Sequence, residues 1–382
     1  MATELTLMNN TTIPIENKID QIHACVQFIL GETAVLKTIT CNDLGYQTPN
    51  FTTAGIYHLH GIAEIQNKQL PWSIILKIIK PDSTEKANPL YHNYWRREAL
   101  VMEARLLEEL PNSIHAAQSY LVEEQPDETI WLWMEHVEGK YAYSQEQFCF
   151  IARQLGRFNG AYLTGNRSIP DYSWICNSWL KSWTKACRMY APNPEAYVNR
   201  LNKDHERSIW SWYQEFNQQV DATIGSLEQL PRVLAHQDLS QMNMLLVNNN
   251  TISDELVLID WQFMSISGIG EDLGKLYGVN MSLGIIPPDQ YEVFQSSLFN
   301  AYLEGLRDMG WMGDERLARY GYCVSMSVRS VWEVPHFFAS AAKLEIEPQN
   351  HKLKERMSRL ERIISIHQKM ALEADSLKEI FR

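Results

Sequence analysis

The sequence predicts an α+β protein of two lobes, a small β-rich N-terminal lobe with one helix and a large, mainly helical C-terminal lobe. β-branched and apolar runs fill the first third of the chain, and helix-forming segments dominate after Gly139. A length of 382 residues is enough for two such units, because domains average about 150 residues. We therefore expect the hinge between the lobes near residues 135–139.

The N-terminal lobe should contain paired strands around a single helix. Apolar or β-branched runs predict strands at 56–65, 72–79, 117–122 and 129–137. The polar segment 66–69 predicts an antiparallel hairpin between the first two, and 125–127 predicts the turn between the last two. Residues 94–110 lack Gly and Pro and stop at Pro111, a pattern typical of a helix.

The C-terminal lobe should consist of helices and one short hairpin. Helix-forming segments lie at 145–163, 174–190, 195–216 and from 290 to the C-terminus. Residues 244–247 and 256–259 predict a strand pair, joined by the loop 248–255. We divide the chain into an N-terminal extension, an N-terminal lobe and a C-terminal lobe, at 1–20, 21–137 and 138–382.

Composition excludes several classes of protein. Hydrophobic residues make up 45% of the chain and charged residues 21%, as in folded proteins and unlike disordered ones. The formal charge of −12 disfavours nucleic acid and anionic membranes as partners and favours a cationic or neutral one. No signal-peptide pattern and no run of about 18 uncharged apolar residues occurs, so we expect a cytoplasmic protein without membrane spans. The irregularly spaced cysteines indicate no zinc site.

The strongest chemical signal lies in residues 235–243. His236, Asp238 and Asn243 form the pattern H-x-D-x-x-x-x-N, and Asp260 follows after an apolar hairpin, in the sequence I-D-W. The first carboxylate can orient a hydroxyl group, while the amide and the second carboxylate can share a hard cation such as Mg²⁺. Asp and Asn also favour turns without any chemical role, but the I-D-W at hairpin spacing weakens that explanation. The pattern predicts phosphoryl transfer.

With these residues the chain resembles the aminoglycoside phosphotransferase and choline kinase branch of the protein-kinase-like fold, over roughly residues 30–340. The resemblance implies that Asp238 is the catalytic base and that Asn243 and Asp260 hold Mg²⁺. It further implies that His236 braces the catalytic loop. Asp272, in the sequence G-E-D-L, matches a family element that anchors loop backbone.

A kinase-like N-terminal lobe should supply a lysine for the nucleotide phosphates and a carboxylate to position it. Lys77 lies within an apolar strand and is our candidate, whereas Lys80 at the strand end can reach solvent. Glu98 matches the family position for the carboxylate, and Glu103 is the rival because a helical wheel places it on the apolar face. We favour Glu98.

The resemblance also locates the rest of the nucleotide site. Glu135, His136 and Val137 lie in the segment joining the lobes, whose backbone should bind adenine. The phosphate-covering loop should be 48–55, but it has one glycine instead of a glycine-rich motif. Threonine and backbone N–H groups would have to hold phosphate there, and the sequence leaves open whether the nucleotide is ATP or GTP.

Departures from protein kinases favour a small-molecule acceptor. Gln237 and Ser240 stand where protein kinases carry Arg and Lys around the catalytic Asp, and no A-P-E motif follows Asp260. Tryptophans gather in the segment 172–216: Trp174, Trp179, Trp183, Trp210 and Trp212. They are more typical of core, but an aromatic wall beside carboxylates would suit a cationic acceptor such as an aminoglycoside-like antibiotic.

Other functions remain open at this stage. The acceptor could instead be a choline- or sugar-type metabolite. A metal-dependent hydrolase would use His236, Asp238 and Asp260 as ligands, but it leaves Lys77 and the β-rich lobe unexplained. A nucleotide-binding pseudoenzyme is disfavoured because Lys77, Asp238, Asn243 and Asp260 are all present. The sequence does not determine the acceptor or the oligomeric state.

Overall fold

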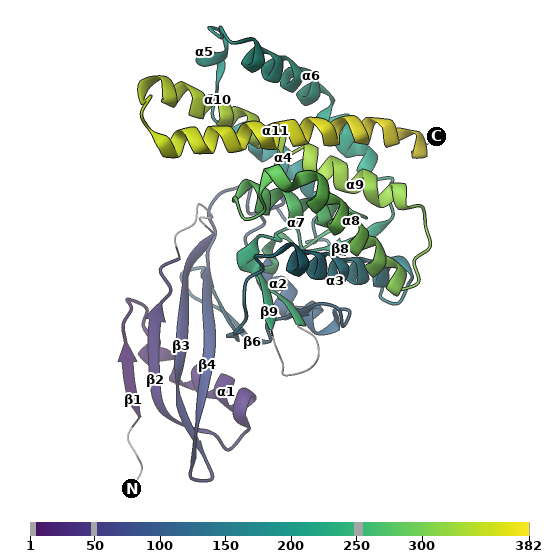
Figure 1. Ribbon diagram of the computed structural model, residues 1–382. Helices are drawn as coiled ribbons and strands as arrows, with labels where there is room; N and C mark the ends of the chain where they lie inside the picture. The colour runs from purple at the N-terminus through teal and green to yellow at the C-terminus, as the bar shows by residue number, and fades with distance from the viewer. Residues whose placement is uncertain (1–4, 47–51, 248–254, 382) are drawn as a thin grey trace.

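The computed structural model describes residues 5–46, 52–247 and 255–381. Its chain forms a sheet-containing N-terminal part and a larger helical C-terminal part, drawn in purple to blue and in teal to yellow (Figure 1). This arrangement confirms the predicted α+β fold class.

The N-terminal lobe is built on a six-stranded sheet. In spatial order the strands are β1 (Thr6–Asn9), β2 (Val35–Asp43), β3 (Thr53–Ile65), β4 (Lys68–Ile79), β7 (Ile130–Glu135) and β6 (Ser119–Glu124). β1 pairs with β2 in parallel, and the other neighbours are antiparallel. β3 and β4 are the predicted hairpin, which turns tightly at Gln66 and Asn67, both of positive φ.

Helices cover both faces of this sheet. Side chains alternate along β4, so neighbouring residues of this strand contact different helices. Ile74, Leu76 and Ile78 of β4 belong to an apolar cluster with α1 (Ile19–Leu30). Ile79 belongs to a second cluster, with Ala99 and Met102 of α2 (Arg97–Glu103). Lys77 therefore lies on the α2 side of the sheet.

The C-terminal lobe is mainly helical. Its helices are α3 (Gln145–Leu163), α4 (Trp179–Tyr190), α5 (Glu195–Val198), α6 (Asp204–Leu227), α7 (Glu271–Ser282), α8 (Tyr291–Asp308), α9 (Glu315–Ser327), α10 (Ser330–Ile346) and α11 (His351–Leu377). α3 begins and ends where the sequence predicts, and Ser144 and Gln147 form a capping box at its start. The large apolar core of the C-terminal lobe includes Phe148 and Trp261.

Short elements next to the lobe junction carry the chemical motifs. A two-stranded sheet consists of β8 (Arg232–Ala235) and β11 (Ser265–Gly268). A three-stranded sheet consists, in spatial order, of β5 (His115–Ala116), β10 (Glu255–Leu258) and β9 (Met244–Val247). Single 3₁₀ turns are η1 (Ile15–Lys18), η2 (Leu106–Glu109), η3 (Gln241–Asn243), η4 (Trp261–Phe263), η5 (Pro288–Gln290) and η6 (Lys378–Phe381). The antiparallel β9–β10 pair is the predicted hairpin, and residues 248–254 of its loop lie outside the described residues.

Several predicted boundaries are wrong. The helix expected at 94–110 is only α2, because Arg105 has a left-handed φ of 55° that breaks it before η2. The helix expected at 195–216 is divided into α5 and α6, and α4 begins at Trp179 instead of 174. The stretch after 290 is divided into α8 to α11, with a turn at Gly310 of positive φ.

Other elements were not identified from the sequence. The sequence analysis predicts no element at α1, α7, β2, β5, β8 or β11, and none at β1, which lies within the stretch expected as an N-terminal extension. Among the helices that the structure describes, none is long and apolar enough to cross a lipid bilayer.

Candidate active site

The candidate active site is a cavity of about 780 Å³ between the two lobes. Side chains singled out by the sequence analysis line it from both lobes: Lys77, Glu98, Asp238, Asn243 and Asp260. Residues 135–139 of the connecting segment form a further part of its wall. Segments more than 180 residues apart in the chain thus meet at one place.

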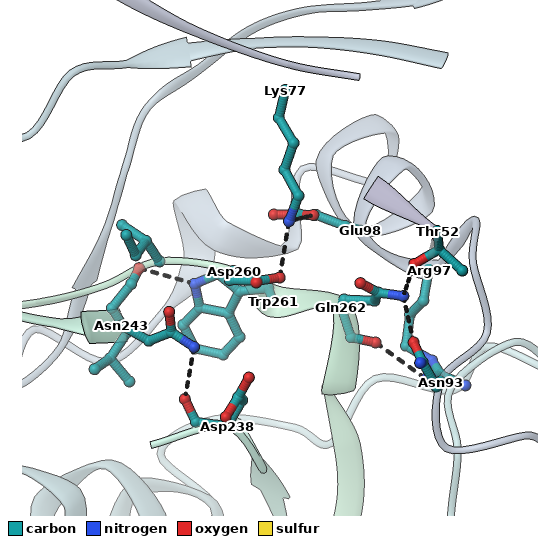
Figure 2. Close-up of polar contacts among 12 residues, drawn as sticks. Thr52, Lys77, Asn93, Arg97, Glu98, Asp238, Asn243, Asp260, Trp261 and Gln262 are labelled. Carbon is teal, nitrogen blue, oxygen red and sulfur yellow. Dashed lines mark hydrogen bonds and ion pairs between the residues drawn. The ribbon is translucent and has the colours of Figure 1, made fainter. Parts of the chain in front are cut away.

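Lys77 forms ion pairs with two carboxylates in this cavity (Figure 2). Its Nζ lies 2.6 Å from Oε2 of Glu98 and 2.9 Å from Oδ1 of Asp260. Burial opposes the charge on Lys77, but the two carboxylates raise its pKa well above the usual value. Burial also opposes the charge on Asp260, yet the Lys77 ammonium lowers the pKa of that carboxyl. Both groups are therefore charged at neutral pH.

The buried face of α2 decides which glutamate meets Lys77. Glu98 lies in the first turn of α2, on the side that covers the β4 face carrying Lys77. Glu103 is the last residue of α2 and is exposed to solvent. Lys80, at the end of β4, is exposed as well. Of the two glutamates weighed from the sequence, Glu98 is the one paired with the lysine.

Arg97, next to Glu98, is a buried residue that the sequence analysis does not identify. Its guanidinium donates hydrogen bonds of 2.7 to 3.1 Å to main-chain carbonyls, those of Pro89, Tyr91, His92, Trp174 and Gln262. Burial lowers the pKa of Arg97 to about 10, which leaves it protonated at neutral pH. These bonds hold the first turn of α2, and with it Glu98, against the C-terminal lobe.

Replacing Arg97 with Met is expected to destabilise the protein by about 3 kcal/mol or more, because several buried carbonyls lose their donor. Thermal and denaturant unfolding measure this effect. Arg105→Met is the matched control, since Arg105 is exposed and pairs with Glu108 at the surface, where water screens the interaction. Equal stability of the Arg97→Met variant and the wild type would contradict this role.

Hydrogen bonds from main-chain N–H groups hold the loop around Asp238. Oδ2 and Oδ1 of Asp272 accept from the N–H groups of His236 and Gln237, at 2.8 and 2.9 Å. The N–H of Asp238 donates to Nδ1 of His236 at 3.1 Å, which leaves the ring proton on Nε2, 3.1 Å from the carbonyl oxygen of Ile259. Gln237 has a φ of 61°, a strained conformation for a residue other than glycine. Through these contacts, His236 and Asp272 could support the loop as expected.

Asp238 and Asn243 lie at the two ends of the loop. Burial raises the pKa of Asp238 to about 6, so the carboxyl is still mostly ionised at neutral pH. Nδ2 of Asn243 donates to the carbonyl of Asp238 at 3.1 Å (Figure 2), and no described residue donates to its Oδ1. The N–H of Ile259 donates to the carbonyl of Asn243 at 3.1 Å, which brings Asn243 next to Asp260.

The oxygen atoms of Asn243 and Asp260 suit a magnesium ion. Mg²⁺ is held in nucleotide sites by one or two protein oxygen ligands, together with water and substrate phosphates. No group of three or more His, Cys, Asp or Glu side chains among the described residues could hold a metal ion. Asn243 and Asp260 line the same cavity, and two oxygen donors are enough for a nucleotide-bound Mg²⁺, whose other ligands are water and phosphates.

The segment joining the lobes leaves main-chain groups for a ligand. Glu135 ends β7 and makes two hydrogen bonds with Gln118. The N–H of Glu135 donates to the carbonyl of Gln118, and the carboxylate of Glu135 accepts from the N–H of Gln118. Among the described residues, no turn or loop hydrogen bond uses the main chain of His136 or Val137, and both line the cavity. The ring Nδ1 of His136 lies 2.8 Å from Oγ of Ser73.

The expected phosphate-covering loop, 48–55, is described only in part. Residues 48–51 lie outside the described residues, and 53–55 belong to β3. Thr52 is buried, and its Oγ1 accepts a hydrogen bond from Nε2 of Gln262 at 3.1 Å (Figure 2). Since Gln262 follows Asp260 by two residues, this bond ties the start of β3 to the proposed metal ligand.

The tryptophans of the segment 172–216 do not form one wall. Trp179 and Trp183 of α4 stack with ring centres 5.9 Å apart, while Trp210 and Trp212 pack in a separate apolar cluster. Trp179 is buried, and Nζ of Lys275 lies 4.3 Å from its ring centre. Trp179 is therefore part of the core, the interpretation that the sequence favours, and the alternative of an open aromatic wall is wrong at this ring, because a cation of the chain itself contacts it.

Comparisons with known proteins agree with this geometry. The model of the phosphotransferase enzyme family matches residues 72–312. The fold is similar to that of a microcompartment-associated aminopropanol kinase, with 13% identity, a TM-score of 0.54 and coverage of 91% of this chain and 97% of the other. It is also similar to the amicoumacin kinase hAmiN, solved with AMP-PNP, Ca²⁺ and Ami, with 14% identity, a TM-score of 0.51 and coverage of 92% and 96%. No curated protein matches the chain at a significant level.

Proposed function

Because the chain belongs to the phosphotransferase enzyme family and is a small-molecule kinase, we propose that it transfers the γ-phosphate of ATP or GTP to a hydroxyl group of its acceptor. One observation carries the proposal. A cavity between the lobes is lined by all the side chains that such a transfer needs, namely Lys77, Glu98, Asp238, Asn243 and Asp260.

The N-terminal lobe binds and orients the nucleotide. The main chain of His136 and Val137 hydrogen-bonds the base, and the Lys77 ammonium pairs with the α- and β-phosphates. Glu98 holds Lys77 in place through their ion pair of 2.6 Å, and this pairing keeps the lysine charged in a buried position. Positioning of this kind supplies much of the rate enhancement in phosphoryl transfer.

Asn243 and Asp260 would hold Mg²⁺ through their side-chain oxygens. When bound, the ion neutralises charge on the phosphates as the transfer proceeds. Asp260 is prepared for this role because Lys77 keeps its carboxylate ionised. The hydrogen bond from Nδ2 of Asn243 to the carbonyl of Asp238 directs the amide oxygen of Asn243 away from the loop.

Asp238 orients the acceptor hydroxyl and accepts its proton. The acceptor oxygen forms a bond to the γ-phosphorus, the bond from that phosphorus to the β–γ bridging oxygen breaks, and the electron pair leaves with the nucleoside diphosphate. His236 and Asp272 fix the loop main chain, so that the carboxylate of Asp238 is presented to the cavity. The supporting groups therefore act through Asp238.

The acceptor is an aminoglycoside-like antibiotic or a related hydroxylated metabolite. A choline- or sugar-type metabolite is the second candidate. Gln237 supports a small acceptor, because it lacks the guanidinium that protein kinases use at this position to bind a phosphorylated loop.

The hydrolase alternative is disfavoured by the contacts of His236. Nδ1 of its ring accepts from the N–H of Asp238, and Nε2 lies 3.1 Å from the carbonyl oxygen of Ile259, so neither nitrogen is left for a metal. Burial also lowers the pKa of His236 to about 4, which keeps the ring neutral at neutral pH. A metal-dependent hydrolase would need this histidine as a ligand.

Nucleotide consumption over a panel of acceptors tests the proposal. ATP and GTP are each offered with Mg²⁺ and with aminoglycosides, other hydroxylated antibiotics, amino alcohols, sugars and hydroxy acids. The expected result is transfer of phosphate to at least one acceptor, dependent on both nucleotide and Mg²⁺. Conversion of an acceptor without nucleotide, or no transfer to any compound, would contradict the proposed function.

Glu98→Gln is expected to raise the KM for nucleotide by about tenfold and to lower kcat, because the neutral amide holds Lys77 less firmly. Glu103→Gln is the matched control and should change neither constant, since Glu103 is exposed. Steady-state kinetics at varied nucleotide concentration measure both effects. A larger effect from Glu103→Gln would transfer the positioning role to that residue.

A further inference from the structure

Lys275 is a buried cation that the proposed mechanism does not use. It lies in α7 with only 7% of its surface exposed. Within the part of the chain that the structure describes, its Nζ takes part in no hydrogen bond or ion pair. In the sequence it is the only charged residue between Asp272 and Asp289, a signal that the sequence analysis does not exploit. Burying an ammonium group without an anionic partner costs free energy of folding, so we looked for a ligand that could pair with it.

Aromatic rings surround the ammonium group on one side. Nζ of Lys275 lies 4.3 Å from the ring centre of Trp179, and 5.9 Å from those of Trp183 and Phe263. Faces of aromatic rings attract cations, and this attraction replaces part of the lost hydration. Phe263 also lines the cavity that contains Asp238. Phe263 thus connects the surroundings of the ammonium to the wall of this cavity.

Lys275 and Asp238 influence each other without forming an ion pair. Burial lowers the pKa of Lys275 to about 8. Among the charged groups, Asp238 does most to raise this pKa again. Burial raises the pKa of Asp238 to about 6, and Lys275 is the charged group that most opposes that shift. Phe263 lies against the Lys275 ammonium and lines the cavity beside Asp238, so the two charged groups lie on the same side of the active site.

The second cation near these rings is already neutralised. The guanidinium of Arg329 lies 5.7 Å from the ring centre of Trp183, but its Nη2 is 3.6 Å from Oε1 of Glu333 and donates to Ser282. Of the two cations against Trp183, only Lys275 lacks a carboxylate partner among the described residues. A ligand with a single negative charge therefore suits this place better than a doubly charged phosphate.

On the premise of the proposed kinase activity, we propose that Lys275 binds a carboxylate of the acceptor, which is a small hydroxy acid. The carboxylate pairs with the Lys275 ammonium while a hydroxyl group of the same molecule donates its proton to Asp238. That hydroxyl oxygen then forms the bond to the γ-phosphorus, and the nucleoside diphosphate leaves with the electrons of the broken bond. Lys275 is thus a specificity-determining residue, because it rejects acceptors that leave its charge unpaired.

Matched acceptors test the proposal in the wild-type protein. Glycerate, serine, homoserine and gluconate are each compared with their primary amides, with ATP or GTP and Mg²⁺. We expect kcat/KM for at least one acid to exceed that for its amide by about tenfold or more, since an ion pair with a buried lysine replaces a neutral contact. Glycerol phosphate is included, and preference for it over every carboxylic acid would overturn the assignment to a carboxylate.

Variants at Lys275 separate recognition from general electrostatics. Lys275→Met, of similar length, should reduce kcat/KM for the acid by about 10- to 100-fold more than for the amide, and leave the nucleotide KM unchanged. Lys275→Arg should retain the preference for acids. Lys185→Met is the control, an exposed lysine on the helix that carries Trp179 and Trp183. The acid-to-amide ratio of the wild type tests the claim even where a variant fails to fold.

The outcomes distinguish this inference from the kinase assignment. An equal loss of kcat for acid and amide in Lys275→Met would show that the lysine acts only on Asp238, and would overturn the inference. Transfer to amines or neutral sugars, with none to any acid, would also overturn it and leave the kinase assignment intact. No transfer from ATP or GTP to any compound of either panel would count against the proposed function itself.

Discussion

Asp238→Asn lowers kcat by roughly 10²- to 10⁴-fold, the range expected on loss of a general base. The amide has the shape of the carboxylate but cannot take the acceptor proton. The main-chain contacts of this residue are kept, since its N–H donates to His236 and its carbonyl accepts from Asn243. The loop should therefore keep its conformation, and nucleotide affinity should change little.

Single-turnover kinetics with saturating nucleotide measure this effect on the chemical step. Thermal unfolding with and without nucleotide shows that the variant is folded and binds. Asp289→Asn is the control, because Asp289 is exposed. Near-full transfer by the Asp238→Asn variant would remove Asp238 from its proposed role, whereas loss of nucleotide binding would indicate a structural one.

Asp260→Asn should abolish the effect of Mg²⁺ on the nucleotide complex and lower kcat by at least about 100-fold. The variant loses the charged oxygen ligand but keeps the fold, because Lys77 retains its ion pair with Glu98. A ligand that binds the folded state raises the temperature of unfolding, so Mg²⁺ should protect the wild-type complex with AMP-PNP and not the variant complex.

Calorimetry or dye-based unfolding measures this protection at several Mg²⁺ concentrations. The unliganded variant should unfold at nearly the wild-type temperature, since the Asn side chain can still accept a hydrogen bond from Lys77. Protection by Mg²⁺ that is equal in the variant and the wild type would show that the metal assignment is wrong.

Local patterns in the sequence contain much of the site. The spacing from His236 to Asn243 predicts a catalytic loop, and the apolar run after it predicts the β9–β10 hairpin that returns the chain beside Asn243. Pairing of Leu258 with Met244 then places Asp260 next to Asn243. These contacts are close in sequence and follow from hairpin geometry, so a short window of residues is enough to predict them.

Lys77 is a further residue that the local pattern identifies. A charged residue in an apolar strand must have a partner or a ligand, because its side chain is forced to one face of the sheet. For the carboxylate that serves it, the sequence favours Glu98 but does not exclude Glu103, because a helix over 94–110 would allow either. In the structure the face of α2 that carries Glu98 is buried, and Glu103, about 140° away around the helix, is exposed.

By itself, then, the sequence determined the two-lobed α+β fold, the catalytic-loop motif and the lysine on β4, because each depends on periodicity or spacing within one element or one hairpin. Only the tertiary structure decided the partner of Lys77, the burial of Arg97 among carbonyls from both lobes, and the position of Lys275 against Trp179. Those contacts join segments that are distant in the chain, and their energies depend on burial and charge that no local pattern records.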